Sequence, residues 1–406
     1  MYNLLGGMRV VEASAFVAGP SCGLYLAQLG AEVIRVDQIG GGPDFRRWPL
    51  SPDNGASLYW EGLNKAKKSV ALDLSRPEGR ELLARIITAP GDNAGLFVTN
   101  FPVAGFLAYD KLRALRDDLI CVRVMGWPDG RPALDYTVNA AIGVPLMTGP
   151  ADDARPVNHV LPAWDLLTGA YAAFSLMAAE RDRRLTGQGR EIRLPLSDIA
   201  IASLGHLGQI GEVAAQGQDR ARMGNEIFGA FGRDFLTRDG HRLMVVAITP
   251  RQWTGLLAVL DLEAPVAALE AELGVSFAKD EGVRFDHRTR LMPLIEAAIG
   301  AREASGLTAA FETRAVCWST YRTLSQALAE DPYFSADNPV LTPIDHPSGG
   351  HYLAAGFAGT LPEDQRLPPV AAPALGRDTD EVLARVLGLS SGEIARLHDA
   401  CLAAGA

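Results

Sequence analysis

Short apolar strands and helices alternate through the first two hundred residues, and this alternation constrains the fold more than any other feature. Met8 to Glu12 is typical of a strand, and Pro20 to Leu29 of a helix with proline in its first turn. Gly30 ends that helix, and Ala31 to Asp37 is typical of a second strand. This β-α-β unit predicts parallel strands joined by a crossover helix.

The alternation continues beyond this unit, with a Ser75-x-x-Glu78 capping box that predicts a helix from Arg76 to about Thr88. We therefore expect an α/β fold with an open, doubly wound, mostly parallel sheet, a Rossmann-like large domain. Such sheets bind ligands beyond the carboxyl ends of their strands, where Asn100 and Phe101 fall. The further strands are expected at 69–73, 95–99, 119–125 and 190–196, with helices at 110–116 and 197–213; 126–150 is too rich in Gly and Pro for regular structure.

The loop from Ala13 to Gly19 indicates whether the first β-α-β unit can bind a dinucleotide. Asp37 stands where a ribose-binding acid would lie, but the loop contains one glycine. The dinucleotide fingerprint needs a glycine triplet to bring the backbone against pyrophosphate. The sequence therefore argues against NAD binding.

A smaller α+β domain is expected over residues 225–325, with the large domain formed by 1–224 plus 326–406. Asp234 to Ile248 predicts a β-hairpin that turns at Asp239-Gly240, and helical segments follow it. Two helices, Asp380 to Leu387 and Ser391 to Ala404, are expected to end the chain.

Composition excludes several classes of function. The chain has 406 residues, 48% of them hydrophobic, and a net charge of −10, which argues against a nucleic-acid surface. The four cysteines form no Cys-x-x-Cys pair, and the histidines lack metal-ligand spacing. The start lacks the pattern of a signal peptide, and no apolar run has membrane-spanning length. We expect a cytoplasmic protein without a metal or redox cofactor.

Two motifs can each be interpreted as structural or as functional. Arg46, Arg47 and Lys65, with two more lysines at 67 and 68, suit either a phosphate site or a solvated loop. Gly388-x-Ser390-x-Gly392 matches a hydrolase elbow, but a helix precedes it and Ser390 begins a capping box, so we interpret it as structural.

The stretch Val160 to Phe174 places one carboxylate, Asp165, where an apolar helix is expected to begin. An aspartate there can cap the first free N–H groups of the helix. It can also act as a covalent nucleophile held ionised by the positive helix end. The stretch alone leaves both readings open.

Several stretches together resemble family III CoA-transferases, in the order of that family and over essentially the whole chain. In this family the nucleophilic aspartate lies in an Asp-x-x-x-Gly stretch that opens a helix, and Asp165-Leu-Leu-Thr-Gly169 corresponds to it. The stretches that carry the resemblance are 8–37, 64–79, Asn100-Phe101-Pro102 and 374–380, and also 135–139, 158–165 and 228–234.

The resemblance implies that Asp165 is the catalytic nucleophile and that CoA binds as part of the substrate, with no further cofactor. It places Phe16, Val17, Leu72, Asn100 and Phe101 along CoA, and Arg46, Arg47 and Lys65 at its phosphates. It further implies an interlocked homodimer with no nucleic-acid or membrane partner. The sequence departs from the family at Leu63 and Gln38, where basic residues are common, and at Leu134, where racemase relatives carry a histidine base.

Within the family, the sequence is most similar to members that transfer CoA intramolecularly between the C1 and C4 carboxyls of a C5 unsaturated diacid, mesaconate. Two alternatives stay open. One is an intermolecular transferase that moves CoA from a dicarboxylic acyl-CoA to a free acid. The other is a non-catalytic acyl-CoA-binding protein, which has no need of Asp165.

Overall fold

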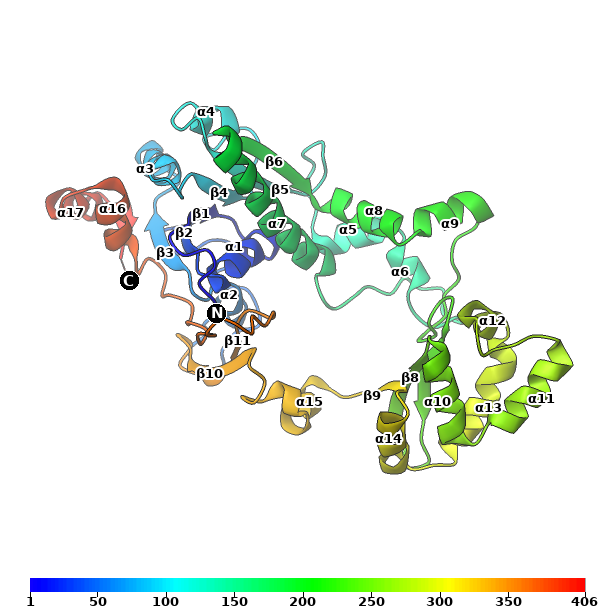
Figure 1. The fold of residues 1–406 in the computed structure, drawn as a ribbon. Helices are drawn as coiled ribbons and strands as arrows, with labels where there is room; N and C mark the ends of the chain where they lie inside the picture. Colours follow the sequence, from blue (N-terminus) through cyan, green and yellow to red (C-terminus); the bar gives the residue numbers. More distant parts are fainter. Residues whose placement is uncertain (406) are drawn as a thin grey trace. The chain divides into compact units, whose positions relative to one another are not determined.

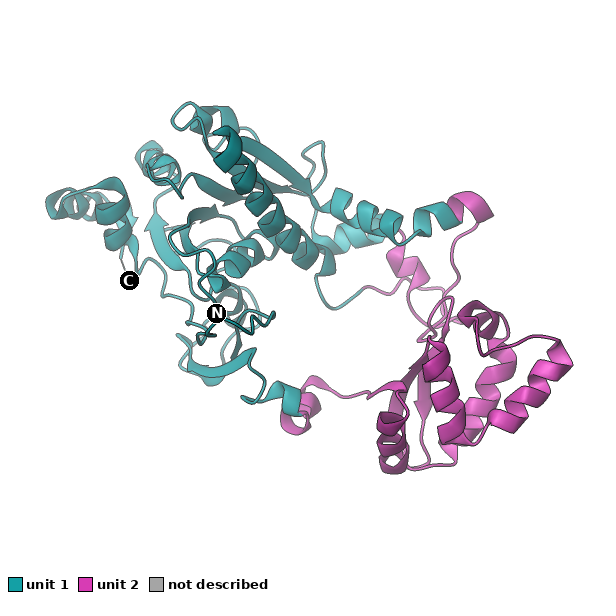
Figure 2. Cartoon of the chain, viewed as in Figure 1, with its two compact units in different colours: residues 1–142, 159–212, 332–406 teal, residues 143–158, 213–331 magenta. Residues whose placement is uncertain are grey.

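The computed structural model describes residues 1–405, which form two compact units (Figure 2). The first contains Met1–Ile142, His159–Glu212 and Pro332–Ala406, and the second contains Gly143–Asn158 and Val213–Asp331. Within residues 1–405, no helix is both long and apolar enough to cross a membrane.

A seven-stranded sheet forms the centre of the first unit (Figure 1). Its order is β12-β3-β2-β1-β4-β5-β6, and every neighbouring pair is parallel except β12 with β3. This confirms the expected mostly parallel α/β sheet. The strands are β1 (Arg9–Ala13), β2 (Glu32–Gln38), β3 (Lys68–Leu72), β4 (Leu96–Thr99), β5 (Ile120–Met125), β6 (Arg190–Pro195) and β12 (Ala403–Ala404).

The strand order reverses at β1, because the chain runs outward to β2 and β3 and then returns to β4 on the other side. At such a switch point the loops after the two central strands separate and leave a crevice at the carboxyl edge of the sheet. The topology therefore assigns ligand binding to the loops that follow β1 and β4.

Helices cover both faces of the sheet. Helices α1 (Ala18–Gln28) and α7 (Ala163–Thr186) pack on one face, with Cys22, Leu26 and Leu176 in the shared core. The opposite face is covered by α3 (Pro77–Thr88), α4 (Tyr109–Arg113), α16 (Thr379–Leu387) and α17 (Ser391–Asp399). The remaining elements of this unit are α2 (Leu58–Leu63), α5 (Asp135–Ala141), α8 (Leu196–His206), a 3-10 turn (Pro332–Phe334), β10 (Leu341–Asp345) and β11 (His351–Ala355).

Gly169 explains why the nucleophile candidate is followed four residues later by glycine. Helices α1 and α7 lie side by side (Figure 1), and a Cβ at Gly169 would come within 2.7 Å of the Ser21 Cβ and 2.8 Å of the Ala18 carbonyl oxygen. Any larger side chain would force the helices apart, because packed interiors leave no spare volume. Gly169 thus fixes the first turns of α7, including Asp165, against the start of α1.

Several sequence-based expectations are wrong in detail. Asp165 is not the N-cap of α7: the helix begins at Ala163 after Pro162, which places Asp165 third in the helix. The Ser75 capping box does not form, since α3 begins after Arg76 and the Ser75 hydroxyl donates to Asp73. The segment 126–150 contains two helices, α5 and α6 (Val144–Met147), and the start of α5 is closed within the segment, where the Leu134 N–H donates to the Thr137 hydroxyl.

Two further helices end earlier than the sequence predicts. The helix expected over 197–213 is broken at Leu207 and Gly208, whose φ of +77° ends α8 before α9 (Gln209–Gln216) begins. The last helix ends at Asp399 rather than Ala404, and the chain then adds β12 to the edge of the sheet beside β3. The Ser390 capping box is present, as expected.

The second unit is built on a three-stranded antiparallel sheet in the order β7-β8-β9. The turn of its hairpin contains Gly240 at a φ of +82°, as the Asp-Gly pair predicts. Its strands are β7 (Phe231–Leu236), β8 (Arg242–Ala247) and β9 (Cys317–Thr320). Its helices are α6, α10 (Pro250–Leu260), α11 (Glu263–Leu273), α12 (Glu281–Asp286), α13 (Arg288–Gly300), α14 (Ala304–Thr313) and α15 (Leu324–Glu330), and α9 crosses the boundary between the units in the sequence.

Candidate active site

A cavity of about 640 Å³ opens at the switch point of the sheet, beyond the carboxyl ends of β1, β4 and β5. Five of the residues proposed from sequence line it together: Phe16, Val17, Asn100, Phe101 and Asp165. Its volume falls in the range of small-molecule sites. The topology therefore brings the nucleophile candidate and four of the expected CoA residues to one place.

The start of α7 is capped by a residue from another helix. Pro162 at the N-cap has no side-chain acceptor, and Asp135 at the start of α5 takes this role. The Asp135 Oδ2 atom accepts hydrogen bonds from the backbone N–H groups of Trp164, at 2.6 Å, and of Asp165, at 3.0 Å. The helix end that points at the cavity is thus held by a buried carboxylate, and the Asp165 side chain does not do the capping.

The Asp165 carboxyl has an unusual proton affinity. Its partial burial, reinforced by the negative charge of Asp135, raises its pKa from 3.8 to about 7, against the opposing effect of Arg47. The expectation that the helix start holds the carboxylate fully ionised is therefore wrong, because desolvation and a like charge both disfavour the ionised form. At neutral pH the ionised and protonated forms of Asp165 coexist.

The loop after β1 is shaped by contacts with the end of β4. The Asn100 side chain bonds both backbone groups of Ala15: its Nδ2 donates to the carbonyl oxygen at 3.0 Å and its Oδ1 accepts from the N–H at 3.2 Å. The next residue, Phe16, has a φ of +70°, a conformation that costs energy for a residue with a Cβ. Asn100 therefore shapes the cavity wall, since its amide is already used within the protein.

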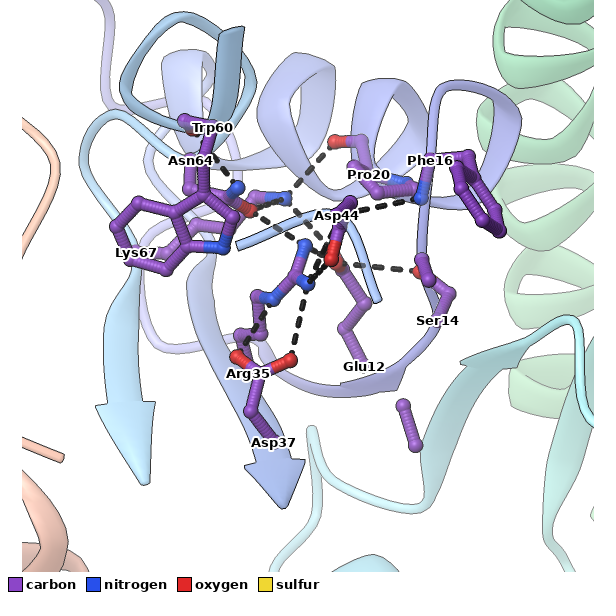
Figure 3. Close-up of polar contacts among 12 residues, drawn as sticks. Glu12, Ser14, Phe16, Pro20, Arg35, Asp37, Asp44, Trp60, Asn64 and Lys67 are labelled. Atoms are coloured by element: carbon purple, nitrogen blue, oxygen red, sulfur yellow. Dashed lines mark hydrogen bonds and ion pairs between the residues drawn. The ribbon is translucent and has the colours of Figure 1, made fainter. Parts of the chain in front are cut away.

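A buried network of charges fixes this strained turn (Figure 3). The Phe16 N–H donates to Asp44 at 3.0 Å, and Asp44 is bound by Arg35 at 2.9 Å. Arg35 is 1% exposed and also binds Asp37, at 2.8 Å. Burial alone lowers the pKa of Arg35, but the surrounding carboxylates outweigh it and raise the pKa above its ordinary value.

The network continues beneath α1 through Glu12 and Lys67 (Figure 3). The Lys67 Nζ donates to Glu12 at 2.8 Å, to the Pro20 carbonyl oxygen at 2.9 Å and to Asn64 at 2.9 Å. Burial lowers the pKa of Lys67, and Glu12 opposes that shift. Lys67 was one of the cations that suited a phosphate site, but its ammonium group instead binds groups inside the protein.

The loop after β4 is held by one arginine. Arg123 on β5 is fully buried, pairs with Glu191 at 2.8 Å, and donates to the carbonyl oxygens of Phe101, Pro102 and Leu107 at 2.8–3.0 Å. A guanidinium with five donors suits such a task, because it satisfies several backbone acceptors at once. Arg123 thereby fixes the cavity wall that contains Phe101.

The remaining expected CoA residues lie outside the cavity lining. Leu72 is 0% exposed in the core beneath α3 and α16. Lys65 is buried, its Nζ donates to the Gly62 carbonyl oxygen, and burial together with the nearby Lys67 lowers its pKa to about 8. Arg46 is exposed at the edge of a separate cavity of about 510 Å³.

Arg47 is exposed and lies close to the lining without forming part of it. Its guanidinium carbon is 5.6 Å from the centre of the Phe16 ring and 5.4 Å from that of Tyr59. Its charge also reaches Asp165, whose pKa it lowers. Of the three expected cations, Arg47 is thus the one whose charge lowers the pKa of Asp165.

Sequence reasoning missed Asp135, His159, Arg35 and Asp44. His159, interpreted as an ordinary histidine, places its Nε2 atom 2.5 Å from the Asp135 Oδ1 atom. The stretches 135–139 and 158–165 carried the resemblance to the family, but nothing in them indicated which side chains meet. Pro162 before an apolar helix was the usable signal, because a helix whose own N-cap cannot accept a bond needs a cap from elsewhere.

The arrangement is suited to acyl transfer. A carboxylate with a near-neutral pKa lies at the wall of a cavity whose size fits an organic ligand. Within residues 1–405, no group of three or more His, Cys, Asp or Glu side chains is arranged to hold a metal ion. A carboxylate placed in this way is a group that can attack an acyl carbon.

The fold and the site together define the class: the chain belongs to CoA-transferase family III, whose profile matches residues 5–379. The 2-methylfumaryl-CoA isomerase of Chloroflexus aurantiacus is 49% identical over 405 residues, covering 100% of this chain and 99% of that protein. The succinyl-CoA–D-citramalate CoA-transferase of the same organism is 28% identical and covers 97% of this chain and 96% of its own length. A CAIB/BAIF family protein from Brucella suis has the same fold, with a TM-score of 0.77 and 25% identity over 95% of this chain and 100% of that structure.

Proposed function

We propose that this chain catalyses the intramolecular transfer of CoA between the two carboxyl groups of mesaconate, converting 2-methylfumaryl-CoA to 3-methylfumaryl-CoA. The observation that carries the proposal is the 49% identity, over the full length of both chains, to an enzyme named for this isomerisation. The site supports it, because Asp165 lines a cavity at the switch point and has a pKa of about 7. A homodimer and CoA bound as part of the substrate belong to the same proposal.

The first half of the reaction removes CoA from the C1 carboxyl. An Asp165 oxygen attacks the C1 thioester carbonyl, the C–S bond breaks, and CoA leaves as a thiolate; the product is a mixed anhydride. The thiolate then attacks the Asp165 carbonyl carbon, the anhydride C–O bond breaks, and mesaconate is released into the cavity beside an aspartyl-CoA thioester. Each covalent step replaces one activated acyl group by another of comparable transfer potential.

The second half repeats these steps at C4. The C4 carboxylate of the retained mesaconate attacks the Asp165 thioester and expels the thiolate, which gives a second anhydride. The thiolate attacks the C4 carbonyl carbon, and the Asp165 carboxylate leaves. No proton is gained or lost overall, so the cycle requires an ionised nucleophile at its start. It also requires exclusion of water, which would hydrolyse either anhydride.

The tetrahedral intermediates need hydrogen-bond donors for their oxyanions. Arg47 and Tyr59 are candidates for the free carboxylate of the diacid, since Arg47 is a cation and the electrostatic influence of Asp165 reaches both side chains.

The experiment incubates the purified protein with 2-methylfumaryl-CoA alone and separates the two thioesters by chromatography. We expect isomerisation without added acid, no incorporation of labelled free mesaconate, and a CoA-bearing Asp165 peptide in acid-quenched samples. Asp165→Asn should lower the rate by at least about 10³-fold, because it removes the nucleophile. The matched control is Asp182→Asn, an exposed carboxylate on the same helix that pairs with Arg190, and it should leave the rate unchanged.

Each contrary result selects one of the alternatives. A strict requirement for an external acid identifies an intermolecular transferase and contradicts the intramolecular proposal. Full activity of Asp165→Asn rejects the nucleophile. Binding of the thioester without any turnover identifies a non-catalytic acyl-CoA-binding protein.

A further inference from the structure

The start of α7 has a feature that nucleophilic attack by Asp165 does not by itself require. Asp135, from α5, is 1% exposed, yet it pairs with no arginine or lysine in the ion pairs of residues 1–405; its partners are two backbone N–H groups and His159. A buried carboxylate is costly unless its oxygens are bonded. The structure satisfies both oxygens and leaves the negative charge in place beside Asp165.

The two oxygens of Asp135 have separate tasks. Oδ2 accepts the N–H groups of Trp164 and Asp165 and so fixes the backbone of the nucleophile. Oδ1 contacts the His159 Nε2 atom at 2.5 Å. The orientation of Asp135 is therefore fixed by contacts to both of its carboxylate oxygens.

Aromatic contacts hold His159 in turn. Its ring lies between those of Tyr136, at a centroid distance of 5.8 Å, and Trp164, at 6.4 Å. The Trp164 indole N–H donates to the Asn139 Oδ1 atom at 3.1 Å, which ties the start of α7 to α5 a second time. Because the contacts run in a closed chain from α5 through His159 and Trp164 back to α5, the nucleophile's backbone is held rigidly.

We propose that Asp135, oriented by His159, is the positioning residue of the nucleophile: it caps α7 from α5 and keeps a fixed negative charge beside Asp165. This inference rests on the proposed role of Asp165. The charged and titratable groups that act on Asp165 are Asp135 from α5, Arg47 from the loop after β2 and Tyr59 from α2, with His159 acting through Asp135.

The fixed charge has a chemical consequence. Burial and Asp135 raise the pKa of Asp165 to about 7, so the carboxylate is more basic than an ordinary aspartate. A more basic nucleophile attacks faster once it is ionised, and a pKa near the working pH retains a large ionised fraction. The placement of Asp135 therefore adjusts Asp165 toward strong nucleophilicity and away from permanent ionisation.

The test is the pH profile of Asp135→Asn. The amide has the same shape and keeps an oxygen acceptor, but it carries no charge. We expect the acidic limb of the kcat/KM profile to move to lower pH by about 1 unit, since a like charge is removed. We expect kcat above pH 8 to fall on the order of tenfold, because the nucleophile is less basic and less well placed.

Two matched variants separate positioning from general folding effects. Asp378→Asn removes another carboxylate that accepts a backbone N–H, that of Ser69 at 2.9 Å, and it should leave the limb in place. His159→Leu removes the contact to the Asp135 Oδ1 atom, so it should lower kcat in the same direction as Asp135→Asn, whereas a loss that merely reflects folding would also appear in Asp378→Asn. An acidic limb that does not move in a folded Asp135→Asn enzyme overturns the proposal.

A second measurement does not depend on turnover. The carboxyl carbon of Asp165, labelled with ¹³C-aspartate and assigned by its loss in Asp165→Asn, is titrated by NMR in wild type and in Asp135→Asn. A lower midpoint in Asp135→Asn supports the inference, and an equal midpoint rejects it. If Asp135→Asn does not fold, Asp135→Ser, a smaller neutral acceptor, takes its place in both measurements. Absence of Asp165-dependent catalysis in the wild type would reject the proposed function while the NMR titration still tests the inference.

Discussion

The loop after β1 and the start of α7 both line the cavity, yet charge holds them in different ways. Around the loop, Arg35 and Lys67 are buried among the carboxylates of Glu12, Asp37 and Asp44, so that each charge has opposite partners. At α7, Asp135 meets backbone N–H groups and a histidine, and its field reaches the nucleophile. The paired charges around the loop maintain its backbone conformation, whereas Asp135 at the start of α7 also raises the pKa of Asp165.

The difference follows from what each region has to do. The Phe16 turn must keep a backbone conformation at a φ of +70°, and paired buried charges with many hydrogen bonds can impose it. Each buried charge at this turn needs a partner of opposite sign, because an unpaired buried ion lowers the stability of the folded protein. In the proposed reaction Asp165 is the nucleophile, so the sign of a neighbouring charge matters there, because it adds to the effect of burial on the pKa of Asp165.

The largest expected effect that tests this comparison is the loss of Arg35. Arg35→Met leaves Asp37 and Asp44 buried without their cation and should lower the free energy of unfolding by about 3–5 kcal/mol. The matched control, Arg385→Met, removes an exposed arginine that also meets two carboxylates, Glu32 and Glu381, and should cost no more than about 1 kcal/mol. Urea denaturation measures both. Equal stability losses would contradict the structural role of the buried network.

The next effect concerns how stability depends on pH at Asp165. The unfolded chain releases the Asp165 proton near pH 3.8, whereas the folded protein keeps it to about pH 7. The free energy of unfolding therefore falls as pH rises through this window, because the folded state binds the additional proton. Asp165→Asn avoids this loss and should be more stable than wild type by on the order of 2 kcal/mol at pH 8, with the difference vanishing near pH 4.

Thermal unfolding of wild type and Asp165→Asn across pH 4–8 measures this difference, with Asp182→Asn as the control for loss of a carboxylate from the same helix. A stability difference that is constant with pH would mean that the folded protein does not raise the proton affinity of Asp165.

The smallest expected effect is that of Arg47. This exposed cation lowers the pKa of Asp165, opposite to Asp135. Arg47→Gln should therefore move the acidic limb of the kcat/KM profile upward, by about half a pH unit, since solvent screens an exposed charge. The comparison variant is Arg46→Gln, next in the chain and exposed at a separate cavity, which should leave the limb in place. A downward shift of the limb in Arg47→Gln would contradict the conclusion that Arg47 lowers the pKa of Asp165.

The parallel strands and the location of the crevice follow from local sequence. Apolar runs such as Ala31 to Asp37, separated by helices and ended by glycine, predict parallel strands, and the structure has them within one residue of the expected bounds at β2. Asn100 and Phe101 could be placed at a carboxyl edge because they directly follow an apolar strand. Asp165 could be singled out because Asp165-Leu-Leu-Thr-Gly169 resembles the Asp-x-x-x-Gly stretch of the family.

The contacts that define the site's electrostatics could not be predicted in the same way. Asp135 and Asp165 are thirty positions apart, and Arg35 and Asn64 are twenty-nine apart, so no periodicity relates them. Two residues at the end of the chain, Ala403 and Ala404, join the sheet because β3 offers an open edge, whereas their sequence suggested the end of a helix. Ser75 lies one residue before the N-cap Arg76, and its hydroxyl donates to the nearby Asp73.

The sequence by itself determined the elements, their parallel arrangement, and the presence of an aspartate at the beginning of a helix behind the crevice. These depend on side-chain period and on residues adjacent in the chain, which local physical chemistry governs. The tertiary structure alone decided that Pro162 leaves α7 to be capped by Asp135, that His159 contacts this cap, and that burial, reinforced by Asp135, raises the pKa of Asp165 to about 7. Proton affinity depends on burial and on charges within a few ångströms, and only the folded chain brings those together.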